Sequence, residues 1–197
     1  MKAGRKHWVY IPVKTLSRIL LSPFFCLEAR GHEYLPKDRA LVFLPKHQRW
    51  EDIPLLALAV HRPLYYIAKH ELFENPFGSW FLKSLGGIPL NRQRPLESRS
   101  AIKAMVELLK KGDDIVVFPE GTYFKNRMGP GQVGIVRLIL SRFSLPFVPV
   151  GIKYSQKGWR TSVRINFGKA FYPDSQVDAD KFLGNVMKEI ALLSGLD

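Results

Sequence analysis

The chain has 197 residues, of which 46% are hydrophobic and 12% aromatic, so it is long and apolar enough to bury a core. Its formal net charge of +13 at pH 7 favours a negatively charged partner, such as a membrane surface, a phosphorylated substrate or nucleic acid. The single cysteine, Cys26, excludes an intrachain disulfide framework and favours a reducing compartment. We expect one domain over residues 1–197, with residues 1–26 as an N-terminal segment.

The N-terminal segment is first basic and then apolar. Residues 1–7 read MKAGRKH, and the apolar stretch that follows is interrupted by Lys14 and Arg18 and broken by Pro23. Its longest uncharged run is too short to span a bilayer, and no small-residue cleavage site follows, so we expect no signal peptide. One helical face would carry Leu16, Ile19 and Leu20. This pattern fits a helix at an anionic membrane surface, and equally an ordinary helix packed on the core.

Strand-like and helix-like segments alternate along the rest of the chain. Strands are predicted over residues 26–31, 40–45, 63–69, 88–92, 114–119, 146–154 and 162–171. Helices are predicted over residues 53–60, 76–87, 102–112, 134–143 and 182–190. This alternation predicts an α/β layered domain with a largely parallel sheet flanked by helices, preceded by a short N-terminal amphipathic helix.

A histidine and an aspartate follow the second predicted strand. The stretch PKHQRWEDIP, residues 45–54, comes directly after the apolar run LVFL, and functional side chains collect where parallel strands end. His47 could take a proton near neutral pH, and an acid such as Asp52 would fix its tautomer. Residues five apart on one helix point about 140° away from each other, so contact requires a loop histidine and a helical aspartate. Alone, the pair could also be a surface histidine and a helix N-terminal acid.

The sequence lacks the motifs of several other enzyme mechanisms, such as a serine or cysteine nucleophile or a metal site. It contains no G-x-S-x-G motif, Cys26 lies in an apolar stretch typical of a core, and the histidines form no compact set of metal ligands. Gly129, Gly131 and Gly134 spell G-x-G-x-x-G, but no strand runs directly into the motif, so a flexible loop is expected there. The mechanism that is left is direct activation of a substrate hydroxyl or of water by the histidine.

Four sequence blocks together resemble the glycerolipid acyltransferase family, whose best-known members are the 1-acyl-sn-glycerol-3-phosphate acyltransferases. The first block is the H-x-x-x-x-D of His47 and Asp52, and the second is AKHELFENPFGSWFLKSLGGIPLNR, which ends at Arg92. FPEGT, residues 118–122, matches the third block, and FVPVGI, residues 147–152, resembles the fourth. The resemblance implies transfer of a fatty acyl group from acyl-CoA or acyl-carrier protein to a lysolipid hydroxyl, with no cofactor.

The resemblance also implies roles for individual residues. His47 and Asp52 would be the general base pair, and Lys69 a candidate to stabilise the developing oxyanion. Arg92 would clamp the acceptor phosphate. Acceptor binding would further involve Glu120, Gly121 and Thr122. For the single cations, the other interpretation is solvated surface charge.

Two blocks depart from the common family pattern. The first block commonly reads N-H-x-S-x-x-D, whereas Lys46 and Arg49 stand here in place of Asn and Ser. The third commonly continues as FPEGTRS, but Tyr123 and Phe124 follow here, so a phosphate-facing arginine is missing. The residues that could replace it are Lys46, Arg49, Lys125 and Arg127. The departures therefore bear on the acceptor more than on the reaction.

Several partners and alternatives follow from these observations. The expected partners are a lysolipid acceptor, first of all 1-acyl-glycerol-3-phosphate, an acyl thioester donor and an anionic membrane surface, with the protein peripheral on the cytoplasmic face. Another lysolipid, including an aminoacyl lysolipid, is an alternative acceptor. A non-catalytic basic protein that binds anionic lipid or nucleic acid is the alternative class. Arg160, Arg164 and Lys169 share an expected strand, but no known nucleic-acid-binding motif accompanies them, so nucleic acid is not expected.

Overall fold

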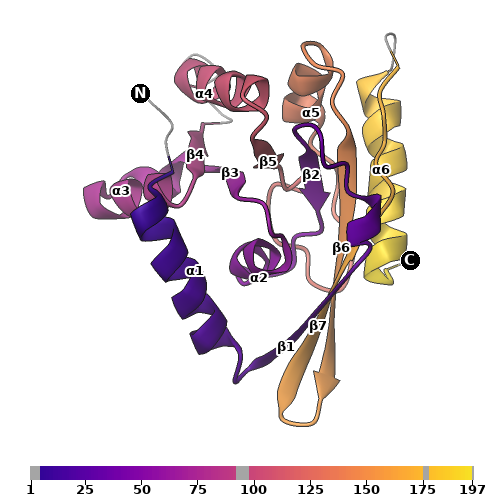
Figure 1. The fold of residues 1–197 in the computed structure, drawn as a ribbon. Helices are drawn as coiled ribbons and strands as arrows, with labels where there is room; N and C mark the ends of the chain where they lie inside the picture. Colours follow the sequence, from indigo (N-terminus) through magenta and orange to yellow (C-terminus); the bar gives the residue numbers. More distant parts are fainter. Residues whose placement is uncertain (1–4, 92–97, 175–177, 197) are drawn as a thin grey trace.

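The computed structural model describes residues 5–91, 98–174 and 178–196, and a seven-stranded sheet forms its centre (Figure 1). The strand order is β1-β7-β6-β2-β5-β3-β4. The strands are β1 (Phe25–Arg30), β2 (Val42–Pro45), β3 (Leu64–Lys69), β4 (Gly87–Leu90), β5 (Asp114–Val116), β6 (Phe147–Lys157) and β7 (Arg160–Phe167). All neighbouring strands are parallel except β6 and β7, which form an antiparallel hairpin. The predicted largely parallel sheet is confirmed.

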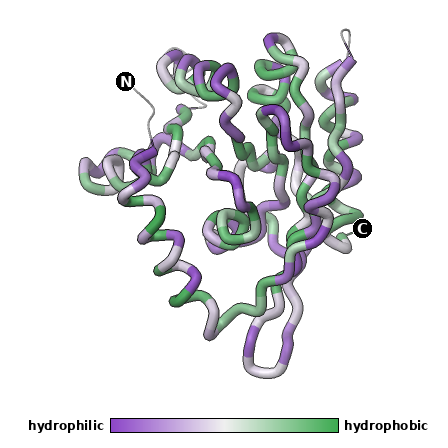
Figure 2. Tube along the Cα trace, in the orientation of Figure 1, coloured by the Kyte–Doolittle hydropathy of each residue, from purple (hydrophilic) through white to green (hydrophobic). Residues whose placement is uncertain are grey.

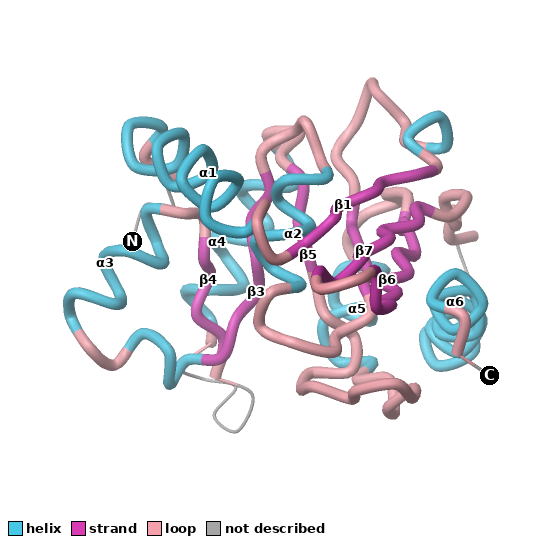
Figure 3. The backbone as a smooth tube through the Cα atoms, turned by 90° about the horizontal axis from the view of Figure 1, so that it is seen from below, coloured by secondary structure: helices cyan, strands magenta, loops and turns pink. Residues whose placement is uncertain are grey.

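Helices cover both faces of this sheet. The α-helices of the described residues are α1 (His7–Leu21), α2 (Asp52–Ala59), α3 (Pro76–Ser84), α4 (Arg99–Lys110), α5 (Val133–Leu140) and α6 (Ala179–Ser194). One hydrophobic cluster joins the sheet to α4, α5 and α6, and a second joins it to α2 and the end of α1. Figure 3 shows α1 and α2 on one side of the row of strands and α6 on the other. Because both faces are covered, all four residues of β2 are buried.

Local sequence signals set several helix ends. The side chain of Asn75 accepts hydrogen bonds from the backbone N–H groups of Phe77 and Gly78, and Pro76 occupies the first position of α3. Helix α6 starts after the Asp178 cap and ends at Gly195, whose φ of +64° is in the left-handed region that glycine adopts readily. It therefore extends beyond the predicted range of 182–190.

Two predicted strands are longer than those observed. Strand β5 ends at Val116, whereas the prediction continued to Pro119. Pro119 has no backbone N–H for the ladder, and the chain turns at Gly121, whose φ is +71°. Strand β7 ends at Phe167 and not at residue 171, although Phe171 still forms an isolated bridge with Phe147.

The β6–β7 hairpin engages two of the cations that were considered for nucleic acid. The guanidinium of Arg160 donates to the carbonyl oxygens of Ser22 and Phe25, at 2.5 and 2.8 Å. Arg164 pairs with Glu28 on the neighbouring β1, with Nε 3.0 Å from Oε2. Both arginines therefore tie β7 to the start of the chain.

Helix α1 packs on the domain along one side and exposes apolar side chains on the other. Val9 is buried, and α1 contacts both α2 and α3. Figure 2 shows hydrophobic residues along α1 interleaved with hydrophilic ones. Five apolar side chains of α1 are between 53% and 68% exposed: Trp8, Ile11, Leu16, Ile19 and Leu20. Lys14 instead turns toward the protein, since its Nζ donates to the Val60 carbonyl oxygen at 2.9 Å. Among the described residues, no helix is both long enough and apolar enough to cross a membrane.

Candidate active site

His47 and Asp52 meet at the end of β2, where the chain passes into α2. His47 lies in the connecting loop, and Asp52 is the first residue of α2. The Nδ1 atom of His47 is 3.1 Å from Oδ2 of Asp52. An ionised carboxylate can only accept a hydrogen bond, so Nδ1 carries the proton in this contact. Nε2 has no hydrogen-bond partner among the described residues and is therefore left as the basic nitrogen.

Asp52 is fully buried and accepts several further hydrogen bonds. Its Oδ2 accepts from the backbone N–H groups of Gln48 and Arg49, at 2.6 and 2.8 Å. Its Oδ1 accepts from the hydroxyl of Tyr154 at 2.5 Å. These donors and the N-terminal end of α2 stabilise the ionised carboxylate, which can then orient the imidazole.

Two aromatic rings enclose the His47 side chain, which is 10% exposed. The Phe118 ring stacks on it with centroids 3.8 Å apart, and the Tyr123 ring approaches edge-on at 4.4 Å. Burial, and after it the nearby charges of Asp52 and Glu51, raise the pKa of Tyr123, so its hydroxyl stays protonated near neutral pH. Phe118 and Tyr123 therefore restrict the orientation of the imidazole ring.

Lys46 and Glu120, both predicted on the acceptor side, form a buried ion pair with each other. The Lys46 Nζ lies 2.8 and 2.7 Å from the two Glu120 carboxylate oxygens, and neither side chain is exposed. Lys46 also donates to the carbonyl oxygens of Phe124 and His47. Burial lowers the pKa of Lys46, an effect that the Glu120 carboxylate opposes. Both side chains are enclosed by the protein, and their roles toward an acceptor remain predictions.

Glu120 also contacts the backbone on both sides of the site. Its Oε2 accepts from the N–H of His47 at 2.9 Å, and its Oε1 accepts from the N–H of Gly129 at 2.6 Å. The Glu120 side chain therefore links the loop that carries His47 to the loop of residues 121–129.

Residues 121–129 are held against the His47 loop by further hydrogen bonds. The N–H of Phe124 donates to the His47 carbonyl oxygen at 2.9 Å. The side chain of Gln48 accepts from the N–H of Asn126 at 2.8 Å and donates to the Ile152 carbonyl oxygen at 2.7 Å. Three predicted acceptor-side residues of this loop are exposed: Thr122, Lys125 and Arg127. These three side chains therefore lie on a loop that is hydrogen-bonded to the His47 loop.

The other predicted cations have different positions. The Arg49 guanidinium lies over the Tyr154 ring, 4.4 Å from its centroid, next to the Asp52 carboxylate that the Arg49 N–H contacts. Lys69 is exposed at the end of β3, and in the described part of the chain no hydrogen bond or ion pair joins it to His47. Arg92 lies outside the described residues. The roles of Lys69 and Arg92 therefore remain predictions.

Sequence reasoning missed Tyr154 and Gln48. Tyr154 lies two residues beyond the fourth block, on the same strand, and is 102 residues from the aspartate that it contacts. Its one sequence signal is a hydroxyl at the point where an apolar strand becomes polar. Gln48 lies between His47 and Arg49 and gave no separate signal. Within the described ranges, no three His, Cys, Asp or Glu side chains are grouped as metal ligands would be.

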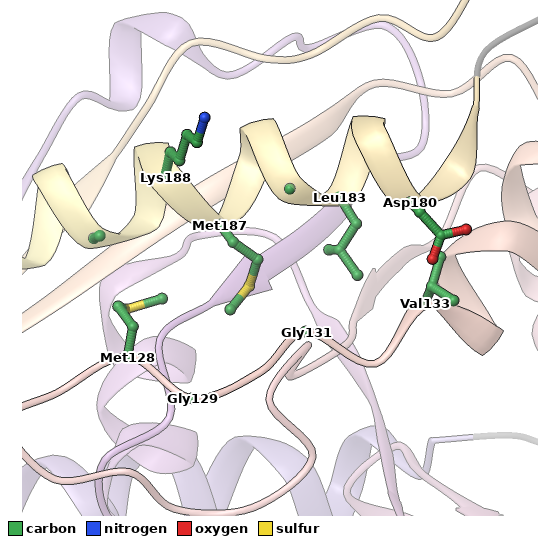
Figure 4. A pocket seen from close by; sticks show the side chains of 10 residues that line it. Met128, Gly129, Gly131, Val133, Asp180, Leu183, Met187 and Lys188 are labelled. Atoms are coloured by element: carbon green, nitrogen blue, oxygen red, sulfur yellow. The ribbon is translucent and has the colours of Figure 1, made fainter.

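A pocket of about 430 Å³ lies between α6 and the loop that carries the glycine-rich motif (Figure 4). Figure 4 shows Leu183 and Met187 of α6 directed toward Met128 and Gly131, while Lys188 points away from them. Gly129 borders this pocket and also donates to Glu120. The loop after the FPEGT block therefore borders both the His47 site and this pocket.

Comparison with known proteins identifies the class to which this fold and this site belong. A family model described as Acyltransferase matches residues 26–153. The chain therefore belongs to the acyltransferase family, as the four sequence blocks predicted.

Individual relatives agree with this assignment. The chain is 32% identical over 148 residues to a chloroplast 1-acyl-sn-glycerol-3-phosphate acyltransferase of Brassica napus, which covers 74% of this chain and 42% of the relative. It is 34% identical over 119 residues to a lyso-ornithine lipid O-acyltransferase of Pseudomonas aeruginosa, which covers 60% of this chain and 45% of the relative. The chain thus spans less than half the length of either relative.

A solved structure shares the fold. The crystal structure of the 1-acyl-sn-glycerophosphate acyltransferase PlsC from Thermotoga maritima matches with a TM-score of 0.71 and 23% sequence identity. The match covers 94% of this chain and 80% of that one. At this level of identity the likeness establishes the α/β fold.

Proposed function

We propose that this chain transfers a fatty acyl group from an acyl thioester, acyl-CoA or acyl-carrier protein, to the free hydroxyl of a lysophospholipid. The acceptor that we favour is 1-acyl-glycerol-3-phosphate, which would give phosphatidic acid. The observation that carries this proposal is the contact of His47 Nδ1 with the buried Asp52 carboxylate, which leaves Nε2 as the base. Membership of the acyltransferase family supports the class of reaction.

The geometry supports direct attack of the acceptor, without a covalent enzyme intermediate. His47 Nε2 removes the proton from the lysolipid hydroxyl while its oxygen attacks the thioester carbonyl carbon. Asp52 stabilises the imidazolium that results. The tetrahedral intermediate then expels the thiolate, which takes the proton from His47 and leaves as free thiol. Lys69 is our candidate to stabilise the oxyanion of this intermediate.

Cations around the site would hold an anionic headgroup. Arg92, at the end of the second block, is the proposed phosphate clamp, because arginine binds phosphate through paired charge-assisted hydrogen bonds. Arg49 and the exposed Lys125 and Arg127 are the candidates for the arginine that the third block lacks. Lys46, the fourth candidate, is buried against Glu120, so we rank it behind the other three.

A second acceptor class has a specific observation in its favour. A relative at 34% identity is named as a lyso-ornithine lipid O-acyltransferase, and such an acceptor carries no phosphate ester. The third block also lacks its usual phosphate-facing arginine, since Tyr123 and Phe124 follow Thr122 here. This absence likewise favours an acceptor without a phosphate ester. We therefore include an aminoacyl lysolipid beside lysophosphatidic acid in the test.

We further propose that the protein binds the cytoplasmic face of a membrane peripherally. The exposed side chains of α1 continue onto α3, where Trp80 lies 6.1 Å from the Trp8 ring and 6.2 Å from the Phe77 ring. We call these residues the α1–α3 surface: Trp8, Ile11, Leu16, Ile19, Leu20, Phe77 and Trp80. Such an apolar surface on a chain with a net charge of +13 suits an anionic bilayer, where each nearby cation contributes about 1 kcal/mol.

The proposed function is tested by measuring thiol release from acyl-CoA and from acyl-carrier protein thioesters, with a panel of lysolipids that includes lysophosphatidate and lyso-ornithine lipid. We expect release with at least one acceptor, and a loss of about 10²- to 10⁴-fold or more in His47→Ala. The matched control is His61→Ala, which removes an exposed histidine after α2. Normal turnover by folded His47→Ala would overturn the mechanism. Vesicle binding without thiol release for any pair would favour a non-catalytic lipid-binding protein.

A further inference from the structure

Tyr154 lies on β6 at the point where this strand leaves the core. Residues Phe147–Ile152 of β6 are buried, Tyr154 is half-buried, and the residues that follow it are exposed. Strand β6 pairs with β2 over residues 147–150 and with the antiparallel β7 from Val150 onward, where Tyr154 pairs with Val163. Tyr154 thus has a fixed backbone and a side chain that reaches from the sheet into the His47 site.

The Tyr154 hydroxyl is the hydrogen-bond donor to Asp52 that comes from the sheet, whereas the other donors come from the loop before α2. Oδ2 of Asp52 takes its partners from residues 47–49, a single loop. Oδ1 accepts from the Tyr154 hydroxyl, at 2.5 Å, on β6, the strand next to β2. Burial first, and then the Asp52 charge, raise the pKa of Tyr154, so its hydroxyl keeps its proton and acts as donor. This bond therefore fixes the carboxylate relative to the sheet and not only to its own loop.

The face of the same ring carries Arg49. The Arg49 guanidinium lies 4.4 Å from the Tyr154 centroid, within the range of a cation–π contact. Arg49 stands where the family commonly has serine, and it is half-buried beside the carboxylate. The Tyr154 side chain thus contacts Asp52 with its hydroxyl and Arg49 with its ring. Asp52 belongs to the proposed His47–Asp52 base pair, and Arg49 is a candidate to bind the headgroup.

We propose, on the basis of the proposed acyltransfer, that Tyr154 is a positioning residue with two separable functions: its hydroxyl holds Asp52 in the orientation that serves His47, and its ring holds Arg49 toward the acceptor headgroup. The two functions use different atoms. A substitution that removes the hydroxyl alone therefore differs in its effect from one that removes the ring.

The pH dependence of this arrangement involves every charged or titratable group near Asp52. These groups are Lys46, His47, Arg49, Glu51, Tyr123 and Tyr154. Without the Tyr154 hydroxyl, the Asp52 carboxylate loses one hydrogen-bond donor that stabilises its charged form. We therefore expect the acidic limb of the kcat/KM profile to move to higher pH.

The test compares Tyr154→Phe, Tyr154→Leu and Arg49→Ala with the wild-type chain in the thiol-release assay. We expect Tyr154→Phe to lower kcat by about 10- to 100-fold and to shift the acidic limb to higher pH, with little change in the KM for the acceptor. Tyr154→Leu adds a rise in that KM, and Arg49→Ala gives the rise in KM with a smaller loss of kcat. The control is Tyr66→Phe, which removes a hydroxyl that donates to the Ile53 carbonyl oxygen and leaves the Asp52 carboxylate untouched.

A double-mutant cycle guards against a purely structural effect. If the hydroxyl acts through Asp52, adding Tyr154→Phe to Asp52→Asn lowers kcat no further, whereas independent effects would multiply. Wild-type kcat and an unmoved acidic limb in Tyr154→Phe overturn the role of the hydroxyl. An unchanged acceptor KM in both Tyr154→Leu and Arg49→Ala overturns the role of the ring. Absence of transfer by the wild type, or full activity of His47→Ala, is instead a failure of the proposed function.

Discussion

The Nζ of Lys46 lies 2.7 Å from Oε2 of Glu120, and the side chains of both residues are shielded from solvent. Lys46 comes from the first sequence block and Glu120 from the third, 74 residues later. Their ion pair joins the loop that carries His47 to the end of the FPEGT block. Because Glu120 also accepts the His47 N–H, its charge fixes the backbone of the proposed base.

Breaking this pair should destabilise the fold as well as reduce activity. Loss of one partner leaves an uncompensated buried charge, which costs about 3–5 kcal/mol. We therefore expect Glu120→Gln and Lys46→Met each to lower the free energy of unfolding in urea by about that amount, and the double variant to lose less than the two together. Arg137→Met, which breaks an exposed pair with Asp180, should cost at most about 1 kcal/mol. Unchanged stability with a raised acceptor KM in Glu120→Gln would restore Glu120 as an acceptor contact.

Arg92 should act on the acceptor and not on the thioester. Arg92→Ala removes a charge-assisted contact to phosphate, so we expect the KM for lysophosphatidate to rise more than the KM for the acyl donor. Steady-state kinetics with each substrate varied in turn measures the two values. Arg99→Ala, at the exposed start of α4, is the control for loss of one positive charge. A rise confined to the donor KM would mean that Arg92 serves the other substrate.

The α1–α3 surface should determine membrane binding. Ile19→Glu places a charge in this surface, so we expect less protein to sediment with vesicles of anionic lipid. Leu192→Glu makes the same kind of change on α6, where Leu192 is 70% exposed, and should leave sedimentation unchanged. Binding should also weaken as salt is added, because salt screens the attraction between the basic protein and the anionic lipid. Equal losses in the two variants would assign the effect to charge alone.

Asp114 should make stability depend on pH between about 4 and 6. Burial raises the pKa of this carboxyl from 3.8 to about 6, against the opposing effects of the Leu41 N–H and Arg62. The folded state therefore holds its proton more tightly than the unfolded state, so the stabilisation is full below about pH 4 and is lost as the pH rises through about 6. The change for this one group is on the order of 3 kcal/mol.

Asp114→Asn removes this titration and retains an oxygen for the Leu41 N–H, which donates to Oδ1 at 2.8 Å. In urea unfolding at a series of pH values, the free energy of unfolding of the variant should rise relative to that of the wild type as the pH rises from 4 to 7. Asp113→Asn removes a charge next to the buried group and serves as the control. A constant difference between Asp114→Asn and wild type across this range would show that Asp114 does not titrate there.

Local patterns in the sequence determined the element types and their order. Alternating apolar runs predicted each strand and helix described above, because periodicity and strand or helix length are local properties. Strand β5 was predicted to end at Pro119 but ends at Val116, because an apolar run alone does not show where pairing with the neighbouring strands stops. The contact between His47 and Asp52 was within reach of sequence reasoning, because it spans only five residues and a loop-to-helix junction.

Only the tertiary structure shows which charged side chains are buried. Lys46 and Glu120 were predicted on the acceptor side, and in the structure they pair with each other in the interior. The sequence contains little sign that Tyr154 contacts Asp52, because 102 residues separate them. They meet because β6 pairs with β2 in the sheet, and this pairing cannot be read from the local sequence. Burial and long-range pairing depend on how the layers pack, and a sequence read residue by residue carries no direct record of that packing.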